Sequence, residues 1–176
     1  PSYSVSDLGY GPMHPGTTLS PRVTPQMIGL GLVEQIHPAD ILALADPDDK
    51  DGDGISGKTS IVRDSVTNEL TLGRFGWKAG QPTLNQQNAH AFAGDMGLTS
   101  NLLPRDDCTA SQTSCRQAVN GGQPEVSDDI LALVLFYSRN LGVPARRQVD
   151  DLHVRQGKKL FTQAGCSSCH TPSFTT

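Results

Sequence analysis

The chain has 176 residues, a formal net charge of −4 and 36% hydrophobic residues, with 18 glycines and 12 prolines. This composition suits one ordinary domain, or one domain plus part of another. The acidic balance argues against nucleic acid or an anionic membrane as the partner, and the longest apolar run, residues 130–137, is too short to span a bilayer.

The first half of the chain is expected to combine coil with short helices. Residues 1–23 are rich in Pro, Gly and Ser and predict extended coil. Thr24 is expected to cap a helix with Pro25 in its first turn, which would direct Ile28 and Leu32 towards a core. A second helix is expected near the start of "HPADILALAD". The stretch 61–72 is ambiguous, with a short hairpin as one interpretation.

The second half carries clearer helix signals. Thr83 can cap a helix that ends near residue 93, with Gln86 at capping-box spacing. Ser127 is expected to cap a helix through "DDILALVLFYSRNLG", ended by Gly142. A last helix covers roughly residues 151–163. We therefore expect a mostly α fold with long ordered loops.

One of these loops, residues 99–125, contains the first pair of cysteines. Cys108 and Cys115 lie seven positions apart in the polar stretch "DCTASQTSC", with no histidine near enough in sequence to suggest a metal. We expect them to form a disulfide, which requires Cα atoms within about 7 Å of each other.

The second pair belongs to the most specific chemical signal, Cys166-Ser-Ser-Cys169-His170. Two thiols at this spacing can form thioethers to the two vinyl groups of one haem, and the next histidine is then placed to bind its iron. The preceding "VRQGKKLFTQAG" resembles the start of a class I cytochrome c domain. The alternative is an amphipathic helix followed by a structural disulfide or zinc ligands, although no second Cys/His pair has finger-like spacing.

A cytochrome c domain also needs a second half to cover the haem. Only six residues follow His170. We therefore expect residues 149–176 to be the truncated start of a second cytochrome c domain. Residues 1–148 would be the inter-haem region of a first, peroxidase-like haem domain.

Other stretches resemble one family of bacterial proteins. They are "PRVTPQMIGLGLVEQI", "DPDDKDGDGISGK", "GRFGWKAGQPTLNQQ", "AFAGDMGLTS" and "LGVPARR". Together they are similar to the di-haem oxidoreductases, sometimes called thiol oxidoreductases, which are related to di-haem cytochrome c peroxidases. The resemblance implies a cytochrome c-like di-haem architecture, two covalent haems and a periplasmic setting. It also implies an electron-donor or acceptor protein and a small oxidant such as peroxide as partners.

The resemblance assigns roles within "FGWKAGQPTLNQQNAHAFAGDMG". Trp77 matches a tryptophan between the two haems, and Gln87 matches a glutamine at the distal face of the peroxide-binding haem. Asp95 stands where the family's acid–base glutamate stands. Lys78 and Ala79 replace an Asp-Gly pair, and Asp95 is the shorter acid, so both changes bear on the position of the proton donor.

Each of these assignments has a plainer alternative. Trp77 could be an ordinary core residue, and Asp95 a turn residue before Met96. His90 lies three residues after Gln87, on the same face of a helix, and could act at the distal site.

Asp49, Asp51 and Asp53 alternate before Gly54, which is how a calcium-binding loop opens. This acidic loop is not a standard EF-hand, because Ser60 stands where the EF-hand pattern needs Glu. A bound cation would relieve the repulsion among the carboxylates. The alternative is a solvated acidic turn.

The leading hypothesis is thus a periplasmic di-haem c-type oxidoreductase with peroxidase-like or electron-transfer chemistry, active as an enzyme in the intact protein. The alternatives are a pure electron carrier that activates no substrate, and a calcium-stabilised binding module.

Overall fold

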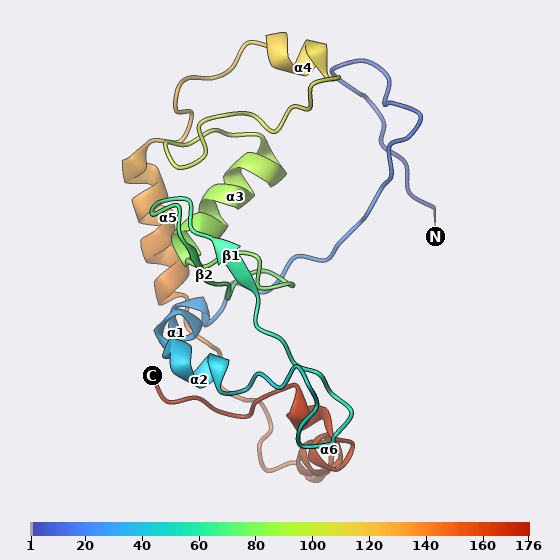
Figure 1. The fold of residues 1–176 in the computed structure, drawn as a ribbon, viewed down its shortest axis with the longest axis vertical. Helices are drawn as coiled ribbons and strands as arrows, with labels where there is room; N and C mark the ends of the chain where they lie inside the picture. The colour runs from blue at the N-terminus through green and yellow to red at the C-terminus, as the bar shows by residue number, and fades with distance from the viewer. Residues whose placement is uncertain (1) are drawn as a thin grey trace.

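A computed structural model describes residues 2–176, and helices account for 33% of the chain. Short helices are separated by long loops (Figure 1). The elements are α1 (Leu30–Gln35), α2 (Pro38–Leu42), β1 (Ile61–Arg63), β2 (Leu70–Leu72), α3 (Leu84–Met96), α4 (Thr113–Gln117), α5 (Asp128–Asn140), α6 (Leu152–Gln163) and the 3₁₀ turn η1 (Cys166–Ser168). The expected mostly helical class is confirmed. In the described part of the chain, no helix combines the length and apolar character that crossing a membrane requires.

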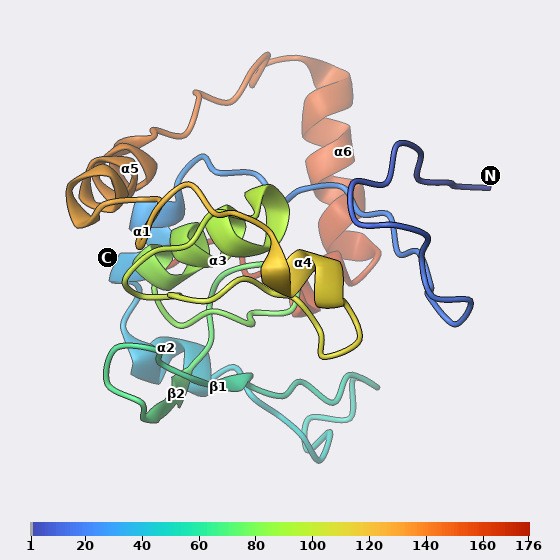
Figure 2. The same cartoon turned by 90° about the horizontal axis from the view of Figure 1, so that it is seen from above.

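The helices α3 and α5 pack against each other, with α3 near the middle of the molecule and α5 on its outer side (Figures 1 and 2). Both begin at the predicted caps. The hydroxyl of Thr83 accepts a hydrogen bond from the Gln86 amide at 3.1 Å, and that of Ser127 accepts one from the Ile130 amide at 3.3 Å. These bonds satisfy amides that have no partner within the helix. The helix α3 continues to Met96, beyond the predicted end, and Gly97 closes it with a φ of 69°.

The core lies where α3, α5 and the strand-like segment before α5 meet. Its buried members are Ala89, Val126 and Leu131, with Phe92, Leu98, Leu102 and Leu103 packed against them. A buried polar pair crosses the same interface, since Asn88 Nδ2 donates to Ser138 Oγ at 3.3 Å. Burial of these apolar side chains is the main driving force that holds the two helices together.

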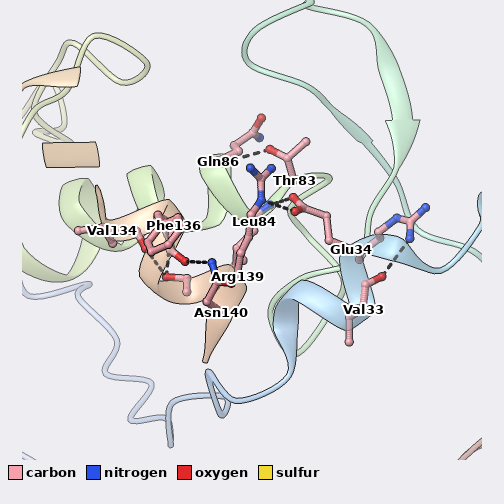
Figure 3. Close-up of polar contacts among 12 residues, drawn as sticks. Val33, Glu34, Thr83, Leu84, Gln86, Val134, Phe136, Arg139 and Asn140 are labelled. Carbon is pink, nitrogen blue, oxygen red and sulfur yellow. Dashed lines mark hydrogen bonds and ion pairs between the residues drawn. The ribbon is translucent and has the colours of Figure 1, made fainter. Parts of the chain in front are cut away.

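Glu34 links three helices through one carboxylate (Figure 3). Its Oε1 accepts from the Leu84 amide at 3.2 Å, at the start of α3, and its Oε2 pairs with Arg139 Nε of α5 at 2.6 Å. The Glu34 side chain is only 15% exposed. These contacts hold α1 in place, because an isolated helix of six residues is too short to be stable in water.

The position at which α1 begins differs from the predicted helix start at Thr24. The helix begins at Leu30 and not near Thr24, which lies in an extended segment. Gly29 adopts a φ of 75°, which strongly favours glycine, and its amide donates to the Leu141 carbonyl at 2.9 Å. This tertiary bond places the bend at Gly29, so Ile28 and Leu32 remain exposed.

The hairpin that was one interpretation of residues 61–72 is present. Strands β1 and β2 are antiparallel, with Ile61 opposite Leu72. The buried side chain of Gln86 fixes the hairpin to α3. It accepts from the Ser65 amide at 2.7 Å and donates to the Arg63 carbonyl at 3.1 Å.

The loop between α3 and α5 is crosslinked as predicted. Cys108 and Cys115 form a disulfide with a Cα–Cα distance of 6.0 Å, which confirms the expected pairing. The short helix α4 starts within the ring that this bond closes. A ring of this size stabilises the fold by roughly 2–3 kcal/mol, through restriction of the unfolded chain.

Glu125 orders the end of the same loop. Its carboxylate accepts from the Thr99 amide at 2.9 Å, the Thr99 hydroxyl at 3.0 Å and the Gly121 amide at 2.8 Å. The hydrogen bonds from the Thr99 and Gly121 amides, then from the Thr99 hydroxyl, lower the pKa of Glu125 below its ordinary value of 4.5.

We expect Glu125→Gln to weaken the loss of folding stability that the parent protein shows as pH falls into the acid range. Because the folded-state pKa is lowered, the contribution of Glu125 is fully present above about pH 4.5 and is lost as pH falls through the folded-state pKa. Urea unfolding midpoints of both proteins, measured from neutral to strongly acidic pH, test this. Parallel curves for the variant and the parent protein would contradict it.

Candidate functional site

Trp77, Gln87 and Asp95 line one open groove with a volume of about 760 Å³. Three segments build it: the loop 73–81, one side of α3, which follows that loop, and residues 20–25 from a distant part of the chain. The structure therefore brings together the three residues that sequence resemblance marked as catalytic. We call this cavity the groove.

The loop 73–81 presents Trp77 at the surface of the groove. Phe75 is buried and pairs with Gln81 through two backbone hydrogen bonds of 3.0 and 3.2 Å. Gly76 and Ala79 both have positive φ, at 78° and 46°, and turn the chain between those bonds. The Trp77 ring stands outward and is 70% exposed. This excludes the interpretation of Trp77 as a core residue in this structure.

Two adjacent glutamines have different surroundings. Gln86 is buried and holds the hairpin, whereas Gln87 is half-buried and lines the groove. A Cβ atom on Gly76 would lie 3.5 Å from Gln87 Oε1, so the backbone at Gly76 passes close to the amide. The Gln87 side chain is thus available to a molecule in the groove.

Asp95 is exposed in the last turn of α3. The C-terminal end of a helix carries partial negative charge, so a carboxylate gains nothing from the helix there. No hydrogen bond or ion pair engages the Asp95 side chain within the described residues. Its carboxylate is therefore free to interact with a ligand.

His90 does not share this groove, which corrects the suggestion that it acts beside Gln87. It is exposed and lines a separate cavity of about 400 Å³, together with residues 103–107. His90 lies on the side of α3 that faces the loop after the helix, whereas Gln87 and Asp95 line the groove.

The C-x-x-C-H motif occupies a turn after α6. Asp151 caps α6 by accepting from the His153 and Val154 amides, and Gly165, with a φ of 77°, ends the helix before η1. Cys166 and Cys169 are free thiols, and Cys169 is exposed. The His170 amide donates to the Cys166 carbonyl at 2.9 Å, so the backbone makes one helical turn between the first cysteine and the histidine.

Apolar side chains adjoin this motif. The ring of Phe161 lies 5.7 Å from that of His170, centroid to centroid, at an angle of 57°. Leu160 and Phe161 are 54% and 44% exposed. Two accessible thiols, an imidazole and uncovered apolar side chains form a set that suits a large apolar group with a metal, and covalent haem fits it.

The motif and the groove are separate in this structure. The helix α6 packs mainly against η1 and lies apart from α3 and α5 (Figure 1). Neither α6 nor η1 contributes to the lining of the groove.

The three alternating aspartates come together in the acidic loop. One carboxylate oxygen each from Asp49, Asp51 and Asp53 lies within 4.8 Å of the other two. Each of these carboxylates accepts a hydrogen bond from a backbone amide. Gly54 donates to Asp49 at 3.1 Å, Asp53 to Asp51 at 3.2 Å and Ile55 to Asp53 at 2.8 Å.

Three contributors to the groove were not predicted from the sequence. Arg22 and Lys78 add two positive charges to its lining, and the Val23 carbonyl accepts a hydrogen bond from Trp77 Nε1 at 2.7 Å. Arg22 and Val23 lie in the stretch "PRVTPQMIGLGLVEQI", which resembles the family, but the resemblance assigned no role to either residue.

Taken together, the helices, the long loops and the C-x-x-C-H turn suit a haem-binding class of protein. A family model described as "Di-haem oxidoreductase, putative peroxidase" matches residues 14–176. The chain therefore belongs to the di-haem oxidoreductase family, which confirms the resemblance seen in its sequence. No curated protein and no solved structure matches it.

Proposed function

We propose that the intact protein is a periplasmic di-haem c-type oxidoreductase that reduces a small oxidant such as peroxide. The observation that carries this is the C-x-x-C-H turn, where two free thiols and a histidine adjoin exposed apolar side chains. Cys166 and Cys169 attach the haem through thioethers, and His170 binds its iron. Covalent haem and the disulfide both suit an oxidising compartment.

The chain divides between the two haem domains of this enzyme. Residues 149–176 begin the second cytochrome c domain, and residues 1–148 belong to the first, peroxidase-like domain. The separation of α6 from α3 and α5 supports this division (Figure 1). The exposure of Leu160 also supports it, because a cytochrome domain would bury that side chain.

The groove residues have distinct roles in this proposal. Haem supplies the redox-active iron at which the oxidant reacts. The Gln87 amide orients the bound oxidant through a hydrogen bond. Asp95 moves a proton from one oxygen to the other, which the exposed carboxylate can do without breaking an existing bond. Trp77 carries electrons between the haems, and an electron-transfer protein supplies them.

Replacing Trp77 by phenylalanine tests the proposed electron path. We expect transfer between the haems to slow, because phenylalanine lacks the readily oxidised indole. Haem content and melting temperature should change little, since the ring is 70% exposed. The measurement is reduction of the second haem, addition of oxidant and recording of both haem spectra in time. Unchanged inter-haem kinetics, or loss of folding, would contradict the role.

Asp49, Asp51 and Asp53 hold a calcium ion in this proposal. Oxygens that bind one calcium ion at about 2.4 Å lie at most about 4.8 Å apart. The three carboxylate oxygens meet that limit without rearrangement.

Calcium should therefore raise the melting temperature relative to a chelator. At a calcium concentration about 100 times the dissociation constant, the stabilisation is about 2.7 kcal/mol. Asp51→Asn should reduce the effect, and Asp106→Asn, an aspartate in another loop, should retain it. Equal melting temperatures with calcium and with chelator would exclude the site.

A further inference from the structure

The segment of residues 20–25, which we call the strap, forms one wall of the groove. Residues 2–28 contain no helix or strand and arch away from the body of the molecule (Figures 1 and 2). One hydrogen bond joins this described stretch to the rest of the chain, from Trp77 Nε1 to the Val23 carbonyl at 2.7 Å. Ser20, Arg22, Thr24 and Pro25 line the groove on either side of it.

The same bond fixes the indole. The Trp77 ring is 70% exposed, so neighbouring side chains do little to hold it. Its residue lies between Gly76 and Ala79, which both have positive φ, so the backbone sets the direction of the side chain but not its rotation. A hydrogen bond to a carbonyl 54 positions away removes that freedom.

We propose that the strap is a positioning element, whose Val23 carbonyl holds the Trp77 indole in the orientation used for electron transfer. This rests on the proposed function of Trp77. In each transfer, the indole gives one electron to an oxidised haem and regains one from a reduced haem. The N–H proton stays on the ring throughout, so atoms and charge balance.

The carbonyl also favours the oxidised form of the ring. An indole that has lost an electron is positively charged, and hydrogen bonds from charged donors are roughly twice as strong as those between neutral groups. The Val23 carbonyl therefore stabilises the oxidised indole more than the resting indole. The strap thus affects both the geometry and the energy of the transfer.

The test places 1-methyltryptophan at position 77 of the full-length di-haem protein, which removes the N–H and keeps the indole. The matched control is 5-methyltryptophan at the same position, which adds a methyl group and keeps the N–H. Two quantities are compared: trypsin cleavage of the Arg22–Val23 bond in the strap, and the rate of inter-haem electron transfer.

We expect the 1-methyl protein to be cleaved after Arg22 about fivefold faster than the 5-methyl protein, as loss of one neutral hydrogen bond predicts. Cleavage after Arg147, in an exposed loop, should be equal in both. Inter-haem transfer should be about tenfold slower in the 1-methyl protein, as loss of a charge-assisted bond predicts.

Equal cleavage after Arg22 in the two proteins would overturn the inference, because the strap would not be held by the indole. Faster cleavage with unchanged transfer would overturn the positioning role. Trp77→Phe separates this failure from that of the proposed function: if phenylalanine also leaves transfer unchanged, Trp77 lies outside the electron path.

Discussion

Gly31→Ala should lower the free energy of unfolding by about 3 kcal/mol, near the upper end of the range for overpacking. A Cβ atom on Gly31 would overlap the Arg139 carbonyl oxygen and lie 3.0 Å from Arg139 Cα. These are backbone atoms of α5, so no side chain can move aside to relieve the contact. The change would push α1 from α5 and disturb the pair between Glu34 and Arg139.

Gly94→Ala is the matched control. Gly94 lies in α3, and nothing is within 4 Å of the position its Cβ would take. That substitution should stabilise the protein by about 0.5–1 kcal/mol, because alanine is the better helix former. The measurement is urea unfolding of both variants beside the parent protein. Similar stabilities for the two variants would refute the close approach of α1 and α5.

Asp95→Asn should reduce peroxidase turnover of the full-length protein by about 10²–10⁴-fold, the usual contribution of a positioned acid–base group. Asparagine keeps the size of the side chain but cannot accept and return a proton. Haem content should be unchanged and the melting temperature should not fall, because Asp95 is exposed and its charge lies at the unfavourable end of the α3 dipole.

Asp150→Asn, at an exposed position outside the groove, is the control and should retain full turnover. Turnover is measured at saturating peroxide with a reduced electron donor. An Asp95→Asn protein that is as active as the control would return Asp95 to the role of a turn residue. A parent protein without peroxidase activity would instead count against the reaction class proposed for the groove.

Local signals predicted the parts of the fold that local interactions determine. The caps at Thr83 and Ser127 are each satisfied within three residues, and Cys108 and Cys115 close a short ring. The predicted start of α1 was wrong because the Gly29 amide is held by the Leu141 carbonyl. No residue near Gly29 in the sequence specifies that contact.

The candidate site also combines residues that the local sequence marks with residues that only tertiary contacts bring in. Trp77, Gln87 and Asp95 could be marked from one continuous stretch, and the structure gathers them in one groove. The opposite wall comes from residues 20–25, and the bond from Trp77 to Val23 spans 54 positions. His90 was misplaced because its surroundings depend on the path of residues 103–107.

The central claim is that Cys166 and Cys169 carry a haem. Mass spectrometry of peptides from the full-length protein, purified from the periplasm, tests it most directly. The peptide containing Cys166–His170 should carry the added mass of one haem, and a Cys166→Ala, Cys169→Ala double variant should lack it. A parent peptide with two unmodified thiols, or with a disulfide between them, would contradict the account.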